Sequence, residues 1–228
     1  MRVLKLYLLA AAVTLTLGSL SAHADSLSLG SSGQSMNYIF QGDLQHASGG
    51  NFTPSSASIG GKTVDFTAVY CVDLFHNIDD QSFYNHTVFT TNGSVNGSTV
   101  NNAAKIAWLI LNTTVTNETQ AAGLQAAIWE TEYGNQFTLL TFGSIANYQS
   151  DDLDALSHAS VSSSLISQLD WITPPTTTEG HGKNTETIYM QGLVGLPDPP
   201  AVPEPATLSL LGTGILGLAG IVRRRMSA

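Results

Sequence analysis

The stretch that decides the fold reads Val64-Asp65-Phe66-Thr67-Ala68-Val69-Tyr70-Cys71-Val72-Asp73-Leu74-Phe75. Apolar side chains occupy every second position from Val64 to Leu74. This period of two predicts a β-strand with one continuous apolar face. Cys71 falls on the opposite, mixed face, so it is not an ordinary member of the apolar row. It is the only cysteine in 228 residues.

The first 24 residues predict an export signal. A short basic region at Arg2 and Lys5 precedes an apolar run from 6 to 20, and Ala22-His23-Ala24 is a small-x-small cleavage site. The mature chain then starts at Asp25. A retained membrane anchor is disfavoured because the apolar run is short. An exported single cysteine implies an intermolecular disulfide, a reactive thiol or another covalent partner.

The charge balance excludes nucleic-acid binding and favours a soluble surface or secreted protein. The formal net charge is −9, and only Lys62, Lys105 and Lys183 supply positive charge between the two ends of the chain. Between the targeting segment and a proline-rich stretch that begins at Pro197, residues 25–196 form one domain of ordinary size with its own core.

Strands and helices are expected in separate parts of this domain. Short apolar pieces between Gly and Ser clusters predict strands and turns over 26–60, and a last strand is expected from 185 to 194. Helices are expected over 103–111, from about 118 to 133, and after Ser150. We therefore predict an α+β fold in which an antiparallel sheet or partial barrel, built from 26–100 and 183–195, packs against a helical insertion from about 101 to 170.

Capping residues define the helix expected over 118–133. Asn117 is a good N-cap, Gln120 stands where a capping-box glutamine reaches back, and Gly134-Asn135 ends the helix. For the third helix, we expect three acidic residues at its positive end. These are Asp151, Asp152 and Asp154.

Gln125 falls in the middle of the apolar stripe of the helix expected over 118–133. Burial of an unpaired amide costs about 1–3 kcal/mol. One explanation is a hydrogen-bonded core glutamine. The other is that the thiolate of Cys71 attacks the Gln125 side-chain carbonyl and expels ammonia, leaving an internal thioester, a reaction that depends on the two groups being held in contact.

Other candidate sites are weaker. His76 suggests a Cys–His nucleophile pair, but its odd offset from Cys71 points it to the other face of a strand. The remaining histidines are isolated, and the acidic clusters lack the glycine and distal glutamate of a calcium loop, so we expect no metal and no cofactor. Glu132 lies on the same helix face as Gln125, where it either polarises the site or forms an ion pair at its rim.

The C-terminal segment resembles a known sorting signal. Val202-Pro203-Glu204-Pro205 precedes an apolar stretch over 206–222, and Arg223, Arg224 and Arg225 follow at once. This order resembles the PEP-CTERM sorting domain of Gram-negative bacteria. The resemblance implies a transient hydrophobic sorting helix in the inner membrane, recognition by an exosortase with cleavage near Pro203 to Pro205, and association with extracellular polysaccharide and biofilm. A plain C-terminal membrane anchor is the alternative.

A second resemblance covers about residues 65–135. Tyr70-Cys71-Val72 followed by Leu124-Gln125-Ala126-Ala127-Ile128-Trp129 resembles the thioester domain of bacterial surface adhesins. It implies that Cys71 is the thiol donor and Gln125 the acyl donor. The expected function is therefore adhesion by covalent capture of an amine- or hydroxyl-bearing surface or matrix ligand, without enzymatic turnover. The alternative is a non-covalent structural protein of the biofilm or polysaccharide matrix.

Overall fold

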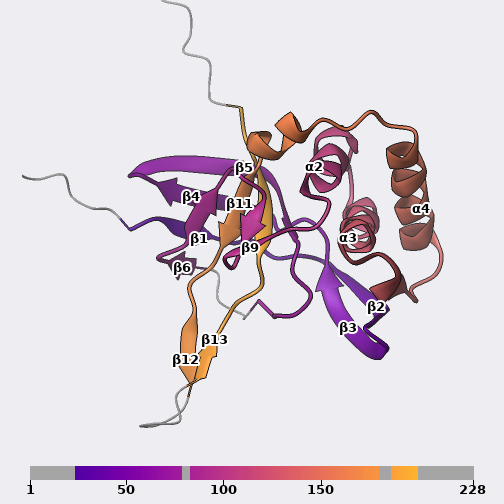
Figure 1. Ribbon diagram of the computed structural model, residues 1–228, viewed down its shortest axis with the longest axis horizontal. Coiled ribbons are helices and arrows are strands. Elements are labelled where there is room, and N and C mark those ends of the chain that lie inside the picture. The colour runs from indigo at the N-terminus through magenta and orange to yellow at the C-terminus, as the bar shows by residue number, and fades with distance from the viewer. Residues whose placement is uncertain (1–23, 79–82, 180–185, 200–228) are drawn as a thin grey trace, which may run out of the picture. The chain divides into compact units, whose positions relative to one another are not determined.

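The computed structural model describes residues 24–78, 83–179 and 186–199. The chain divides into two units after Pro197, and the description that follows concerns the first. In this unit a curled antiparallel sheet, a half-barrel, lies on one side and the helices lie on the other (Figure 1). The α+β class and the partial barrel predicted from the sequence are confirmed.

Seven strands form the main sheet, in the order β6-β1-β4-β5-β14-β11-β7, and every neighbouring pair is antiparallel. Three smaller sheets are β10-β2-β3, β12-β13 and β8-β9. The strands are β1 (Ser26–Ser28), β2 (Gln34–Phe40), β3 (Asp43–Gly49), β4 (Ser55–Ile59), β5 (Lys62–Cys71), β6 (Phe83–Asn85), β7 (Val88–Thr90), β8 (Ser94–Val95), β9 (Ser98–Thr99), β10 (Phe137–Leu139), β11 (Asp170–Thr173), β12 (Thr177–Glu179), β13 (Glu186–Ile188) and β14 (Leu193–Pro197).

Strand β5 forms where the alternating pattern predicts a strand, and it lies in the middle of the main sheet, but its apolar face is not continuous as predicted. The register between β5 and β14 shifts where Ala68 pairs with Leu196 and Phe66 pairs with Pro197. A bulge of this kind turns the side chains on its two sides to different faces. Phe66 therefore packs in the same core cluster as Cys71, while Ala68 packs in the cluster on the other face.

The expected final strand over 185–194 is in fact two strands. Strand β13 pairs with β12 in a separate hairpin, and β14 then pairs with β5 and β11 in the main sheet. Pro197, expected at the start of the linker, is the last residue of β14. Proline is tolerated at a strand end because the missing N–H is not needed there.

The helices are α2 (Ala103–Asn112), α3 (Glu118–Tyr133) and α4 (Ser144–Ser157), with short 3₁₀ helices η1 (Gly134–Gln136) and η2 (Ser163–Gln168). Helix α3 is capped as predicted, since the Asn117 side chain accepts the Gln120 N–H at 3.0 Å. The Gln120 side chain reaches one residue further back than expected and accepts the Thr116 N–H at 2.7 Å. These contacts fix where α3 begins.

Helix α3 is buried on nearly all sides, whereas the sequence predicts a single apolar stripe along it. Every residue from Ala121 to Trp129 is buried. Helix α4 packs closely on it at Gly123, where an added Cβ would lie 2.5 Å from the Cβ of Tyr148. On another side, a Cβ at Gly49 of β3 would lie 3.2 Å from Cγ of Gln125. Small residues at both contacts allow α3 to lie deep in the domain.

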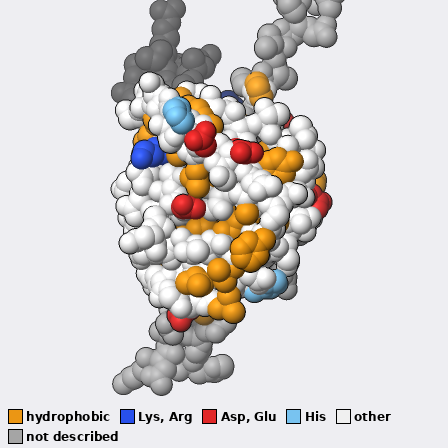
Figure 2. All heavy atoms as spheres, turned by 90° about the vertical axis from the view of Figure 1, so that its right-hand side faces the viewer, with side chains coloured by type: hydrophobic (Ala, Val, Ile, Leu, Met, Phe, Trp, Pro, Cys, Tyr) orange, Lys and Arg blue, Asp and Glu red, His pale blue; other side chains and the backbone are white. Residues whose placement is uncertain are grey.

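The prediction for the third helix was wrong at its start. Helix α4 begins at Ser144, after Gly143 at φ 84°, and not after Ser150. Asp151, Asp152 and Asp154 therefore lie in its second half, away from the positive end of the helix dipole. Figure 2 shows the face that carries α4 and the β2–β3 hairpin, where charged side chains are few and hydrophobic ones gather in a patch in the lower half of the view.

The expected terminal segments lie outside the described residues. These are the export signal, except for Ala24, and the whole sorting segment from Val202 to Arg225, including the apolar run over 206–222. None of the helices in the described ranges combines the length and the apolar character that a membrane crossing needs.

Candidate functional site

The structure brings Cys71 and Gln125 into contact. Gln125 is fully buried on α3, and its side-chain amide forms two hydrogen bonds with the backbone of Cys71. The Cys71 N–H donates to Oε1 of Gln125 at 2.9 Å, and Nε2 of Gln125 donates to the Cys71 carbonyl at 2.7 Å. These two bonds fix the Gln125 side-chain carbonyl beside the last residue of β5.

Gln125 occupies this position because β4 does not extend along the whole of β5. The β4–β5 ladder ends where Ser55 pairs with Phe66, so the later backbone groups on this edge of β5 need other partners. The side chain of Asn51 bonds the Val69 N–H at 2.9 Å and the Thr67 carbonyl at 3.2 Å. The side-chain amide of Gln125 likewise bonds the N–H and the carbonyl of Cys71. It therefore continues the row of hydrogen bonds along this edge of β5.

The thiol of Cys71 points to a different glutamine. Cys71 is 2 % exposed, and its Sγ donates to Oε1 of Gln191 at 3.1 Å. Nε2 of Gln191 donates in turn to the Asp73 carbonyl at 2.6 Å. Burial, and then the negative charge of Asp73, raise the pKa of the Cys71 thiol. Both effects favour the neutral thiol over the thiolate, and the hydrogen bond to Gln191 orients the sulfur.

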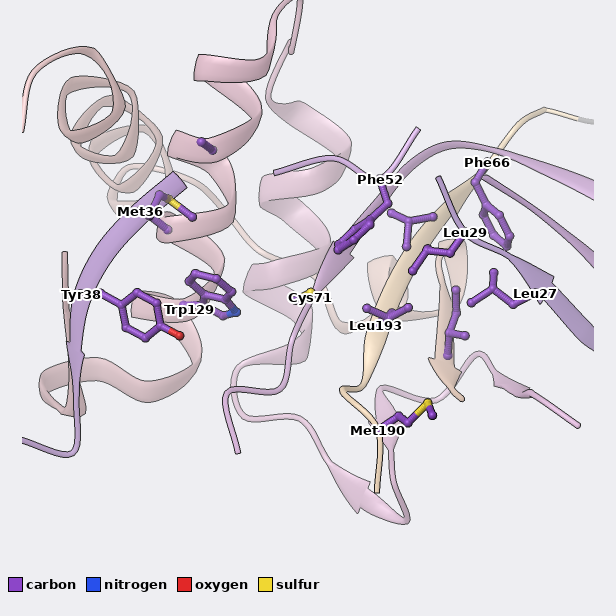
Figure 3. Packing of buried hydrophobic residues seen from close by; sticks show 14 of the residues in the cluster. Leu27, Leu29, Met36, Tyr38, Phe52, Phe66, Cys71, Trp129, Met190 and Leu193 are labelled. Carbon is purple, nitrogen blue, oxygen red and sulfur yellow. The ribbon is translucent and has the colours of Figure 1, made fainter. Parts of the chain in front are cut away.

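Figure 3 shows the surroundings of the thiol. Met36, Tyr38 and Trp129 lie on one side of Cys71, and Leu193, Phe52 and Leu29 lie on the other. All six belong to the same hydrophobic core cluster as Cys71. The sequence predicts a mixed face of β5 at Cys71, but the surroundings of the sulfur are mostly apolar. Apolar surroundings solvate a charge poorly, so the thiolate is disfavoured.

His76 does not pair with Cys71. Strand β5 ends at Cys71, and the chain then turns so that Nδ1 of His76 lies 2.6 Å from Oδ2 of Asp73. The Asp73 carboxylate also accepts the Phe75 N–H at 2.8 Å and Nδ2 of Asn96 at 2.9 Å. The result is a buried aspartate that orients a histidine whose side chain is about one third exposed.

A cavity of about 590 Å³ lies next to the thiol's partner. Its walls include Gln191, which touches the sulfur, and Trp129, which lies one helical turn after Gln125. The indole N–H of Trp129 is buried without a hydrogen-bond partner among the described residues. His46 and His76 also line the cavity. The cavity adjoins the buried Cys71–Gln125 pair through Gln191 and Trp129, although neither Cys71 nor Gln125 lines it.

Glu132 is partly buried, and one of its carboxylate oxygens is shielded from solvent. It lines a second cavity, of about 380 Å³, together with Asp73 and His76. Its Oε2 is buried without a hydrogen-bond partner among the described residues, where it also forms no ion pair. Burial, and then the charge of Asp73, raise the pKa of Glu132 to about 8, while a hydrogen bond from Tyr133 acts against the shift.

This raised pKa predicts a pH-dependent loss of stability. Between pH 4.5 and about 8 the unfolded chain releases the Glu132 proton while the folded chain keeps it, so the free energy of unfolding falls as pH rises. We expect Glu132→Gln to remove this loss and to stabilise the protein by about 2 kcal/mol at pH 9, with little difference at pH 4. Urea unfolding at the two pH values measures the effect.

Glu118→Gln is the matched control, because Glu118 is exposed in the first turn of the same helix. It should change stability equally little at both pH values. A Glu132→Gln variant that is no more stable than the wild type at pH 9 would contradict the assignment of Glu132 as a destabilising, partly buried carboxylate.

Sequence patterns missed Gln191 and the roles of Asp73 and Asn51. Gln191 is 120 positions from Cys71, and nothing in its neighbourhood marks it as a partner of the thiol. Asp73 offered a local signal, since an aspartate three residues before a histidine in a turn can accept its ring N–H. No group of three or more His, Cys, Asp or Glu side chains suited to a metal ion occurs within the described ranges.

The comparisons with known proteins concern the C-terminal end. Residues 201–225 match the PEP-CTERM protein-sorting motif. The PEP-CTERM motif implies that an exosortase processes the protein and that it is exported through the membrane to the cell surface or extracellular space of a Gram-negative bacterium. No curated protein and no solved structure matches the chain. The comparisons therefore give no support to the resemblance to thioester domains, and residues 24–197 have to be interpreted from their own geometry.

Proposed function

We propose that this exported protein is an adhesin that carries an internal thioester between Cys71 and Gln125 and uses it to capture a nucleophile covalently. The observation that supports the proposal is the pair of hydrogen bonds between the Gln125 amide and the Cys71 backbone. A buried carbonyl held beside a buried cysteine has the proximity that an intramolecular acyl transfer requires.

The same two hydrogen bonds suit the chemistry of bond formation. When Sγ of Cys71 attacks Cδ of Gln125, negative charge develops on Oε1, which already accepts the Cys71 N–H at 2.9 Å. The C–S bond forms, the C–N bond breaks, and the amide nitrogen leaves as ammonia with the thiol proton. The sulfur first has to turn from Gln191 to Gln125, a rotation about the Cα–Cβ bond of Cys71.

Capture of a ligand breaks the C–S bond that thioester formation makes. A primary amine attacks Cδ of Gln125, a C–N bond forms, the C–S bond breaks and Cys71 is released as a thiol. The ligand stays attached to Gln125 as a substituted amide, so each molecule reacts once and does not turn over. A hydroxyl ligand reacts in the same way to give an ester.

Incubation of the exported protein with methylamine tests this proposal. We expect the mass to rise by one methylamine, the methylamide to map to the peptide that contains Gln125, and one new thiol to appear at Cys71. Labelling at any other residue, or no labelling of native protein, would contradict the proposal.

The alternative is a non-covalent structural protein of the extracellular matrix, and one observation favours it. The Gln125 amide is fully hydrogen-bonded as an amide, while the Cys71 thiol already has a partner in Gln191. Both side chains then need no further role, because Gln125 completes the backbone bonding of β5. Native protein that keeps its full sequence mass and has one titratable thiol would favour this alternative.

A further inference from the structure

We propose that His76, oriented by Asp73, is the base that takes the proton from the incoming nucleophile and delivers it to the departing sulfur of Cys71. This inference rests on the proposed thioester and assigns the residue that activates its ligand. It concerns a histidine that neither the sorting motif nor the Cys71–Gln125 pair involves.

The contact with Asp73 determines how the imidazole can act. The carboxylate lies 2.6 Å from Nδ1, so Nδ1 carries the proton of the neutral ring and Nε2 keeps its lone pair. Among the described residues, Nε2 forms no hydrogen bond. Asp73 is itself held by donors from Phe75 and Asn96. The ring is therefore oriented through one nitrogen and available as a base through the other.

His76 lies in the wall of a cavity that adjoins the proposed bond through two residues, Gln191 and Trp129. His76 lines the cavity of about 590 Å³, together with Gln191 and Trp129. Gln191 lies 3.1 Å from Sγ of Cys71, and Trp129 follows Gln125 by one helical turn. Gln191 also bonds the Asp73 carbonyl at 2.6 Å, which ties the residues at the sulfur to the turn that carries His76.

The chemistry of capture needs such a base. Attack by a primary amine on Cδ of Gln125 places a positive charge on the amine nitrogen, and a proton must leave before the amide is stable. The sulfur needs a proton in turn, because burial raises the pKa of the Cys71 thiol and a free thiolate is disfavoured there. Nε2 of His76 accepts the first proton and supplies the second, so the ring ends unchanged.

His46 provides a matched comparison, because it lines the same cavity but is engaged on both ring nitrogens. Its Nδ1 lies 2.8 Å from Oδ1 of Asn37, and its Nε2 lies 3.1 Å from Oγ of Ser35. Neither nitrogen is available as a base. If loss of His76 slowed the reaction only because a histidine had been removed from the cavity wall, replacement of His46 should slow the reaction equally.

The test is the rate at which methylamine consumes the thioester in the exported protein, followed by intact mass and by thiol release. We expect His76→Gln to keep the thioester, as its mass shows, and to react about 100-fold more slowly than wild type. His46→Gln also changes the cavity wall, but it should slow the reaction far less than His76→Gln does. Added imidazole should restore part of the rate in His76→Ala, which a purely structural role of His76 would not allow.

The outcomes separate this inference from the proposed function. A thioester that is present and reacts at the wild-type rate in His76→Gln would overturn the role of His76 and leave the thioester standing. Equal slowing in His76→Gln and His46→Gln, without rescue by imidazole, would overturn it too. A wild-type protein that contains no thioester would overturn both.

Discussion

The Cys71→Ala variant is expected to take up no methylamine, whereas the wild-type protein takes up one per chain. Alanine removes the only sulfur that can activate the Gln125 carbonyl, and an unactivated amide does not react with amines under native conditions. The backbone N–H and carbonyl that bind the Gln125 side chain remain, so the fold around α3 and β5 should be retained. Loss of the buried sulfur should cost only about 1 kcal/mol of stability.

Two further variants test whether the uptake of methylamine depends on Gln125 in particular. Gln125→Asn shortens the side chain by one methylene, so its carbonyl no longer reaches Cys71, and it too should take up no methylamine. Gln149→Ala removes another buried glutamine, one on α4 that bonds Glu130 at 2.7 Å, and should take up methylamine normally. Methylamine found on the Cys71→Ala chain would show that the amine attaches by a different route.

Removal of the C-terminal arginines should stop processing of the tail almost completely. The motif at residues 201–225 implies an exosortase substrate, and the apolar run over 206–222 has 17 positions, at the short end for a membrane helix, where about 20 is usual. A short, glycine-containing segment depends on the positive cluster behind it to hold its orientation. We expect replacement of Arg223, Arg224 and Arg225 with serine to leave the unprocessed precursor as the main species.

A variant that keeps the positive charge shows whether processing depends on the charge of the C-terminal cluster or on arginine itself. Replacement of the same three arginines with lysine keeps the positive cluster and should allow processing, with mature protein that ends near Pro203 to Pro205. Peptide mapping of cell-associated and extracellular protein measures both variants. Extracellular molecules that mostly retain peptides from 206–222 would contradict the proposal that the tail is removed.

The elements around the candidate site were predictable where the signal is local. Alternation of apolar residues predicted the strand that ends at Cys71, and the Asn117 cap predicted the start of α3. Helical spacing placed Gln125 among buried residues, as the structure does. These features depend on neighbouring residues along the chain, so the sequence displays them directly.

Features that depend on distant segments were not predictable. The bulge near Thr67 arises from how β14 pairs with β5, about 125 positions later, and it moves Phe66 to the face of Cys71. The contact of Gln191 with the thiol has the same origin. Helix α4 begins at Ser144 and not after Ser150, seven residues earlier than expected, because Gly143 ends the preceding turn. No periodic pattern in the sequence marks that point.

The intact mass of exported, untreated protein tests the central claim most directly. An internal thioester between Cys71 and Gln125 lowers the mass of the processed chain by one ammonia relative to its sequence and leaves no thiol to titrate. We predict this deficit in the wild-type protein and its absence in Cys71→Ala. A wild-type chain of full sequence mass, with one thiol that titrates after gentle denaturation, would contradict the account.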